Sequence, residues 1–339
     1  MSRVKKLLEI GSSPHITDGA SVDNIMFNVV LALLPVTAFA IYAFGSGAAL
    51  VLSTAIVACV LTEHLLCRWT GQESTVGDWS VVITGLLFGL TLPPDLPLWM
   101  VVVGSVFGTG VGKFLFGGLG MNAFNVALVG RAFLQAAFPQ AMTHWQTPFT
   151  DDRFTHIPSS ILSVPFAEPV YDVATAATPL ARMKFEQVFA SDANLMYGLT
   201  TGSVGETCGL LILLGGIYLV ARNMMNWRIP ASIFLSVALM TWIFHQVDPA
   251  TYPGPLFMLF SGGLMLGAVF MATDMVASPI TNAGCWIYGL LIGVLVVVIR
   301  FWGGMPEGVM YAILLANAVS PHIDNVIRPR VFGTGRKAG

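Results

Sequence analysis

Long apolar runs separated by short polar breaks extend along almost the whole chain. Most of these runs approach the roughly 20 residues that an α-helix needs to cross a bilayer. The pattern predicts about ten spans, at 24–44, 48–67, 79–92, 98–116, 124–138, 206–221, 230–244, 256–272, 283–301 and 306–318. Because 79–92 and 306–318 are short for a crossing, we expect them to be tilted, broken or shielded by neighbouring helices.

One polar stretch, 139–205, interrupts this pattern and divides the predicted spans into two groups of five. Loops of this length are usually functional or disordered. The predicted organisation is an N-terminal segment, a first five-helix repeat, the loop, a second five-helix repeat and a C-terminal tail. Their predicted bounds are 1–23, 24–138, 139–205, 206–318 and 319–339.

The two halves show a faint internal similarity. The segment 107–134 resembles 260–290, since each contains a glycine-rich apolar stretch, a short break and another apolar run. An odd number of spans per half would invert the second copy relative to the first. Inverted repeats with broken helices are a recurrent plan among proteins that move ions or small solutes. The predicted fold is therefore an all-α polytopic membrane protein with two inverted five-helix repeats.

Composition supports the membrane class and argues against a nucleic-acid partner. Hydrophobic residues make up 55% of the 339-residue chain and charged residues 10%, whereas soluble domains carry about 25% charged residues. The net charge is −2, so no basic surface indicates nucleic-acid binding. The four cysteines form no CxxC pair, and the six histidines form no HExxH motif. No metal site is therefore predicted.

Basic residues predict the orientation. Short cytoplasmic loops are enriched in Lys and Arg. With the N-terminus inside, most basic residues fall in inside segments, namely Arg3, Lys5, Lys6, Arg68, Lys113, Arg222, Arg228, Arg328, Arg330, Arg336 and Lys337. Only Arg300 borders a short outside loop. Both termini are therefore predicted to be cytoplasmic, with the long loop on the opposite face.

The best candidate for chemistry lies in the long loop. Thr178 followed by Pro179 is typical of a helix start, with Thr as the N-cap and Pro in the first turn. Helix starts collect unpaired N–H groups and favour phosphates, and Arg182 and Lys184 would add positive charge. On residue types alone, an ordinary N-cap remains the alternative.

The surrounding residues match a flavin-attachment motif. Asp172, Thr175, Ala177 and Thr178 follow the pattern D-x-x-[ST]-x-A-[ST]. Together with the ten-span organisation, this resembles the family that comprises the D subunit of Rnf complexes and the B subunit of the sodium-pumping NADH:quinone reductase. Further matching stretches are SSPH at 12–15, TGLL at 84–87, PP at 93–94, GGLGMNAFN at 117–125 and ATDMVASP at 272–279. Ala176 departs from the glycine common in the family, at a variable position of the motif.

The resemblance implies a specific cofactor and site. FMN would be joined to Thr178 through a phosphoester bond by a dedicated flavin transferase. Asp172, Thr175 and Ala177 would be recognition positions for that enzyme. A second, noncovalent flavin such as riboflavin is also implied within the membrane domain. The family fold is similar to that of urea-type channels.

The resemblance also implies a role and a setting. The complex exchanges electrons between reduced ferredoxin and NAD, coupled to movement of Na⁺ or H⁺ across the bacterial inner membrane. This chain would be one translocase subunit, not catalytic alone, with its flavin loop on the periplasmic side. It has no NAD fingerprint or iron–sulfur cysteine pattern, so those cofactors would belong to iron–sulfur and other partner subunits, one of them a second FMN-bearing subunit.

Polar residues in or near the spans are the second class of candidates. Asp274, Arg131, Asn122 and Asn125 are predicted to line an ion pathway or a second flavin site, since such groups usually face a cavity or partner. Lys113, Glu63 and Glu206 are explained by snorkelling towards the membrane surface. Two alternatives to the electron-carrying subunit remain: a transporter or channel without redox chemistry, and a redox-inert scaffold.

Overall fold

The computed structural model describes residues 21–328, apart from 72–74, 168, 170, 172–174 and 207. All the regular elements in this part of the chain are helices. Four of them are long and apolar enough to cross a membrane: α1 (Val22–Phe44), α2 (Ser46–Thr70), α10 (Arg228–Val247) and α13 (Asn282–Trp302). The prediction of an all-helical membrane protein is confirmed at this level.

Shorter helices occupy the other predicted spans. They are η1 (Val76–Asp78) with α3 (Ser80–Leu90), α4 (Leu98–Phe107) with the π-helix η2 (Gly108–Phe114), α5 (Val126–Ala137), α9 (Gly209–Ala221), α11 (Pro255–Phe260), α12 (Leu264–Leu266) with the π-helix η5 (Gly267–Met271), and α14 (Val309–Val326). The predicted span 256–272 is thus broken between α11 and α12. The last helix begins later than predicted and continues to Val326, past the expected boundary at 318.

Local caps explain where several of these helices begin. The side chain of Ser21 accepts the backbone N–H of Asn24 at 3.2 Å, and Thr281 caps Gly284 in the same way at 3.0 Å. The Asn125 side chain accepts the N–H of Leu128 at 3.2 Å at the start of α5. Each contact satisfies a backbone donor that has no partner within its helix.

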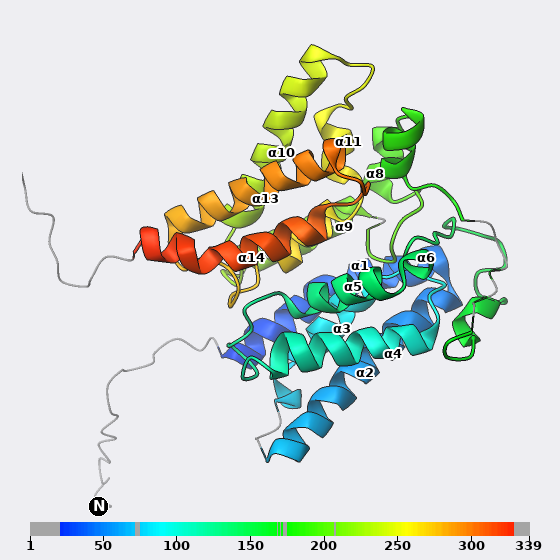
Figure 1. Cartoon of the computed structure of the whole chain (residues 1–339), viewed down its shortest axis with the longest axis vertical. Helices are drawn as coiled ribbons and strands as arrows, with labels where there is room; N and C mark the ends of the chain where they lie inside the picture. Colours follow the sequence, from blue (N-terminus) through cyan, green and yellow to red (C-terminus); the bar gives the residue numbers. More distant parts are fainter. Residues whose placement is uncertain are drawn as a thin grey trace, which may run out of the picture.

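The two halves repeat one scheme of helix contacts (Figure 1). In the first half, α2 packs against α3 and α4, and α4 packs against α5. In the second half, α10 packs against α11 and α13, and α13 packs against α14. Between the halves, α1 contacts α9 and α5 contacts α14. The first helices of the two halves thus contact each other, and so do the last helices; we call these like-with-like contacts.

The internal sequence similarity does not pair equivalent helices, however. Segment 107–134 covers the end of α4 and most of α5, which are the fourth and fifth helices of their half. Segment 260–290 covers α12, η5 and the start of α13, which form the third and fourth helices of theirs. The similarity therefore reflects a local feature that both segments share, a π-helix followed by a break. It does not support an internal repeat.

Small residues set the close packing of α10 on α13. Gly289 and Gly293 of α13 face Ser232 and Ser236 of α10, and a Cβ on Gly293 would lie 2.9 Å from the carbonyl oxygen of Ile233. Small residues four apart let two helix backbones approach closely within a membrane. This contact forms the core of the second half.

The long loop gathers at one end of the helical bundle (Figure 1, green). It contains α6 (Pro139–Met142), the 3₁₀ turn η3 (Ser159–Leu162), α7 (Pro179–Ala181), the π-turn η4 (Arg182–Glu186) and α8 (Asp192–Tyr197). Backbone hydrogen bonds join it to the end of α1, where Phe149 N–H donates to Ala43 O at 2.8 Å. A second bond joins Val204 N–H to Leu92 O at 3.0 Å, just after α3. The described residues of the loop are thus part of the folded body.

Candidate functional site

Thr178 lies at the wall of a cavity of about 310 Å³ between the loop and the two halves. This volume reaches the range of roughly 300–1,000 Å³ typical of small-molecule sites. Residues from α5, α6, both ends of the loop, the α11–α12 break and the start of α14 line it. The lining includes the aromatic rings of Trp145, Phe260 and Tyr311 and the guanidinium-bearing Arg131. The cavity therefore combines aromatic surface, charge and a loop hydroxyl.

The predicted helix start at Thr178 is confirmed. The Thr178 Oγ1 accepts the backbone N–H of Ala181 at 3.2 Å, and Pro179 occupies the first turn. The Thr178 backbone is extended, with φ −67° and ψ 156°. As an acceptor in this cap, the hydroxyl oxygen does not use its own proton, so esterification at Oγ1 is compatible with the cap.

Residues 175–177, directly before Thr178, are hydrogen-bonded to two other segments of the chain. Thr175 Oγ1 accepts the N–H of Trp145 at 3.1 Å, and the N–H of Ala176 donates to Trp145 O at 2.9 Å. The hydroxyl of Thr201 donates to Ala177 O at 2.9 Å. Thr175 and Ala177 thus have structural partners that present Thr178 to the cavity, whereas Asp172 falls outside the described residues.

The two basic residues predicted near a phosphate have other surroundings. The Lys184 ammonium donates to the carbonyl oxygens of Arg300 at 3.2 Å and Met305 at 3.1 Å, and also to that of Gly303. Burial lowers the pKa of Lys184 below its ordinary value. The Arg182 side chain is exposed. No described contact brings either side chain to the Thr178 hydroxyl, so Lys184 acts as an anchor of the loop.

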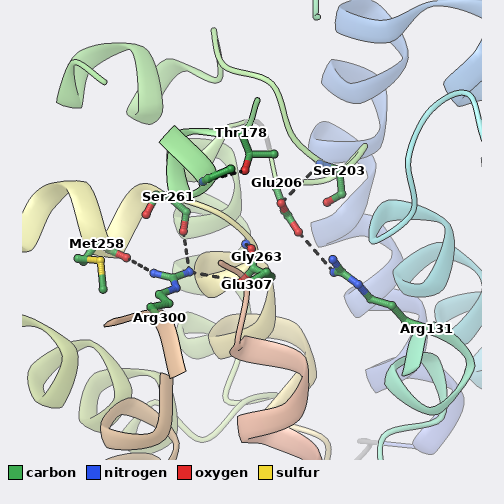
Figure 2. A network of polar contacts seen from close by, with 10 residues as sticks. Arg131, Thr178, Ser203, Glu206, Met258, Ser261, Gly263, Arg300 and Glu307 are labelled. Atoms are coloured by element: carbon green, nitrogen blue, oxygen red, sulfur yellow. Dashed lines mark hydrogen bonds and ion pairs between the residues drawn. The ribbon is translucent and has the colours of Figure 1, made fainter. Parts of the chain in front are cut away.

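Two acid–base pairs lie beside the cavity (Figure 2). Arg131 on α5 pairs with Glu206 at 3.4 Å, and both side chains are buried, at 8% and 7% exposure. Glu206 also accepts the Ser203 N–H at 3.4 Å. This geometry replaces the snorkelling interpretation of Glu206, because its carboxylate is directed into the protein and joins the two halves.

The second pair connects the α11–α12 break with the start of α14 (Figure 2). The Arg300 guanidinium donates to Met258 O at 2.7 Å and to Ser261 O at 2.8 Å, and it pairs with Glu307 at 3.5 Å. Glu307 also accepts the Gly263 N–H at 3.3 Å. Sequence reasoning did not single out these two residues as part of a site, although an Arg within the apolar run 283–301 was the available signal.

A second cavity, of about 130 Å³, opens near the opposite ends of the helices. Asn122, Asn125, Asp274 and Lys113 contribute to its lining. Asn122 Nδ2 donates to Asp274 Oδ2 at 3.2 Å, and Asn125 Nδ2 donates to the Met271 carbonyl at 3.3 Å. The structure thus brings together three of the four residues predicted for an ion or flavin site. Arg131, the fourth, belongs to the other cavity.

Lys113 also forms a buried pair, with Glu63. Its ammonium lies 2.9 and 2.8 Å from the two carboxylate oxygens and 2.9 Å from Ser80 Oγ. The two side chains are only 6% and 3% exposed. The snorkelling interpretation of both residues is therefore wrong, because each charge is neutralised inside the bundle.

A small void of about 10 Å³ lies between the two cavities. Arg131, Glu206 and Glu307 line both this void and the Thr178 cavity. Its wall also includes Leu128 and Met271, and Met271 is the residue whose carbonyl Asn125 binds. Polar groups therefore lie at both ends of this contact between the halves. The wall of the void that separates them is largely apolar and also includes Leu266, Val309 and Met310.

These features define a class: an all-helical membrane protein whose two halves meet around buried ion pairs and hold a loop threonine against a cavity. Comparison with known families agrees with this class. Residues 9–333 match the model of the NQR2, RnfD, RnfE family, and the chain belongs to that family. The resemblance drawn from the loop motif and the span pattern is confirmed.

Curated relatives cover nearly the whole chain. It is 40% identical over 342 residues to the D subunit of the proton-translocating ferredoxin:NAD(+) oxidoreductase complex of Clostridium ljungdahlii, covering 98% of each chain. It is 39% identical over 330 residues to the D subunit of the Na(+)-translocating ferredoxin:NAD(+) oxidoreductase complex of Acetobacterium woodii, covering 96% of this chain and 95% of the relative. It is 40% identical to the D subunit of the ion-translocating oxidoreductase complex of Stutzerimonas stutzeri, covering 93% of both chains.

Proposed function

We propose that this chain is the membrane subunit of an ion-translocating ferredoxin:NAD⁺ oxidoreductase complex and carries electrons through FMN bound covalently to Thr178. The observation that carries this proposal is the position of Thr178, an N-cap hydroxyl at the wall of a cavity of about 310 Å³. The names of the relatives supply the type of complex.

The residues around the cavity suit a flavin. Thr178 Oγ1 would form the phosphoester, Trp145 and Tyr311 offer aromatic surface to the ring system, and Arg131 offers a buried cation. FMN supplies one- and two-electron redox chemistry, and the protein supplies position and electrostatics. Thr175 and Ala177 would be read by the flavin transferase before the loop docks, since their present partners hold them against the folded body.

In-gel fluorescence tests the cofactor. The chain, produced together with its flavin transferase, is expected to give a fluorescent band under ultraviolet light in a denaturing gel. Thr178→Ala should abolish the band and Thr178→Ser should retain it. Thr200→Ala, which removes another hydroxyl from the same cavity wall, is the control and should remain fluorescent. A dark wild-type band, or a fluorescent Thr178→Ala band, would refute covalent attachment at this residue.

We further propose that Na⁺ or H⁺ crosses the protein along the contact between the two halves. The buried polar groups from Asp274 and Asn122 to Glu206 and Arg131 support this path. The cavity at Asp274, at about 130 Å³, is smaller than the roughly 300 Å³ at which small-molecule sites begin. We therefore infer an ion rather than a second flavin there, and a noncovalent riboflavin would need another position.

This path also keeps open a channel or transporter role without redox chemistry. The α11–α12 break and the two cavities favour that alternative as much as they favour a redox subunit. Ion uptake into vesicles separates the two. With a redox subunit, the vesicles take up ions only when electron donor and acceptor are supplied, and Thr178→Ala abolishes this uptake. With a channel, uptake needs no donor or acceptor and persists in Thr178→Ala.

We propose an inner-membrane topology with both termini cytoplasmic, the flavin loop periplasmic and the two halves related as inverted repeats. The like-with-like contacts between halves support the repeat. Partner subunits bearing a second FMN and iron–sulfur clusters would exchange electrons with this chain. All four native cysteines are buried, so single added cysteines can report topology. An impermeant maleimide on intact cells should label Asp152→Cys and spare Arg222→Cys, and the reverse would overturn the orientation.

A further inference from the structure

A stretch of the long loop combines exposure with a complete lack of charge. Residues 154–167, FTHIPSSILSVPFA, contain no Asp, Glu, Lys or Arg, although Arg153 and Glu168 flank them directly. We call these fourteen residues the apolar loop. They include five large hydrophobic residues that are exposed, namely Phe154 at 55%, Ile157 at 47%, Leu162 at 70%, Val164 at 69% and Phe166 at 90%. Single exposed hydrophobic residues are ordinary, but five large ones within fourteen residues indicate an interaction site.

The apolar loop is fastened to the ends of the helices. Arg153 Nε donates to Tyr42 O at 2.9 Å near the end of α1, and Arg153 O accepts the Ser46 N–H at 2.8 Å at the start of α2. Within the loop, the buried hydroxyl of Ser160 donates to Asp95 O at 2.8 Å between α3 and α4. The neighbouring Ile161 is buried. The loop therefore turns one side into the protein and the other outward, at the level where the helices end.

Aromatic residues mark that level as the edge of the bilayer. The Phe166 ring packs on Trp99 with centroids 5.3 Å apart, and Trp99 lies in the first turn of α4. Tyr42, in the last turn of α1, is 55% exposed. Trp and Tyr concentrate at membrane–water interfaces. From Trp99, exposed side chains of Val102, Val103 and Val106 continue along α4. The apolar loop therefore extends an outward-facing apolar surface of this helix.

We propose that the apolar loop is an interfacial segment whose Leu162, Val164 and Phe166 insert into the outer leaflet of the lipid bilayer. Interfacial segments bury their apolar side chains roughly 5–10 Å into the headgroup and acyl boundary. Lipid fits better than a protein partner because protein interfaces are enriched in Arg, whereas none of the fourteen residues is Asp, Glu, Lys or Arg and their exposed apolar side chains continue onto the apolar face of α4. The inference depends on membrane embedding of the helices and is independent of a flavin at Thr178.

Depth measurement by spin labelling tests the inference. Leu162→Cys and Phe166→Cys are each labelled with a nitroxide in the full complex, reconstituted into nanodiscs of phosphatidylethanolamine and phosphatidylglycerol. Val106→Cys on the exposed face of α4 serves as the lipid control, and Asp152→Cys, exposed just before the apolar loop, serves as the water control. The four native cysteines of this chain are buried, which limits background labelling of it, and the complex with no added cysteine supplies the background signal.

The labels at 162 and 166 are expected to relax with oxygen as the label at 106 does, and to resist the water-soluble nickel reagent that relaxes the label at 152. Nickel access equal to that at 152 would overturn the inference by placing the loop in water. Immobile labels shielded from both reagents would overturn it by placing the loop under another subunit. The triple variant Leu162→Ser/Val164→Ser/Phe166→Ser gives a second readout, because a label at Ile157→Cys should then gain nickel access.

Discussion

The ammonium group of Lys184 lies 3.2 Å from the backbone carbonyl oxygen of Arg300, 116 residues further along the chain. Lys184 follows Thr178 within two helical turns. The Arg300 side chain binds Glu307 and the α11–α12 break. One lysine therefore connects the segment carrying Thr178 to the charged network of the second half. Hydrogen bonds to a charged group are worth about 1.5–3 kcal/mol each, which is enough for this connection to set the position of the loop.

Lys184→Met should loosen the loop without unfolding the helices. The methionine preserves length but leaves three carbonyl oxygens without their donor. Because Lys184 is half-buried, we expect the low end of the range, about 1.5 kcal/mol, or roughly tenfold in local opening. Hydrogen–deuterium exchange over 179–186 measures it. Arg182→Met is the matched control, since that exposed side chain makes no described contact. Equal exchange in the two variants would contradict an anchoring role for Lys184.

The pair Arg131–Glu206 should show strong coupling. Removing one partner of a buried pair costs about 3–5 kcal/mol because a charge is left alone. Arg131→Met and Glu206→Gln are therefore each expected to lower the thermal stability of the purified complex. The double variant should lose less stability than the sum of the two single losses. The expected difference is roughly 0.5–3 kcal/mol. Additive losses in thermal unfolding would show that the two side chains act separately.

Gly262 is required by its backbone. Its φ of +62° is unfavourable for residues with a side chain, and a Cβ there would lie 2.6 Å from Leu180 Cδ1 and would collide with Glu307. Gly262→Ala should cost at least about 1–2 kcal/mol from the backbone alone. It should also displace Leu180, two residues after Thr178, and so weaken in-gel flavin fluorescence. Gly254→Ala, where a Cβ meets nothing within 4 Å, should leave melting temperature and fluorescence unchanged.

Packing of α10 on α13 should tolerate no added volume. In Gly293→Val, a branched side chain would meet the carbonyl oxygen of Ile233, which lies 2.9 Å from the Cβ position, and the Ser236 side chain. Overpacking of this kind typically costs about 1–3 kcal/mol. The thermal unfolding midpoint of the complex measures it. Leu290→Val, at an exposed position of the same helix, is the control. If its unfolding midpoint were as low as that of Gly293→Val, tight packing at Gly293 would not explain the loss of stability.

Asp274→Asn should separate ion movement from electron transfer. The asparagine preserves shape and can keep the contact with Asn122, but it removes the carboxylate that an ion would use. Ion uptake by inverted vesicles should fall about tenfold, the effect of losing roughly 1.4 kcal/mol of ion interaction. Thr178 fluorescence should stay unchanged. Asp23→Asn, which removes an exposed carboxylate that does not line this cavity, is the control, and an equal loss there would argue against a specific role for Asp274.

The helices, the helix start at Thr178 and the family could be predicted from the sequence because each depends on residues close together in the chain. The apolar runs located the helices because each must satisfy its backbone within lipid. The helix start at Thr178 was predictable because a Thr–Pro pair needs only its own next few residues. The family followed from the motif at 172–178. Even here, the π-helices η2 and η5 were not foreseen, because apolar periodicity barely changes between α- and π-turns.

Only the tertiary structure decided which charges meet. Arg131 and Glu206 are 75 residues apart and Asn122 and Asp274 are 152 apart, and no local pattern specifies either partner. Lys184 has a charge that suits a phosphate, but its ammonium group binds backbone carbonyls at and after the end of α13. The fold brings three of these carbonyl oxygens to it. Helices are set by neighbours in sequence, whereas buried charges take whichever opposite group the packing of distant helices places beside them.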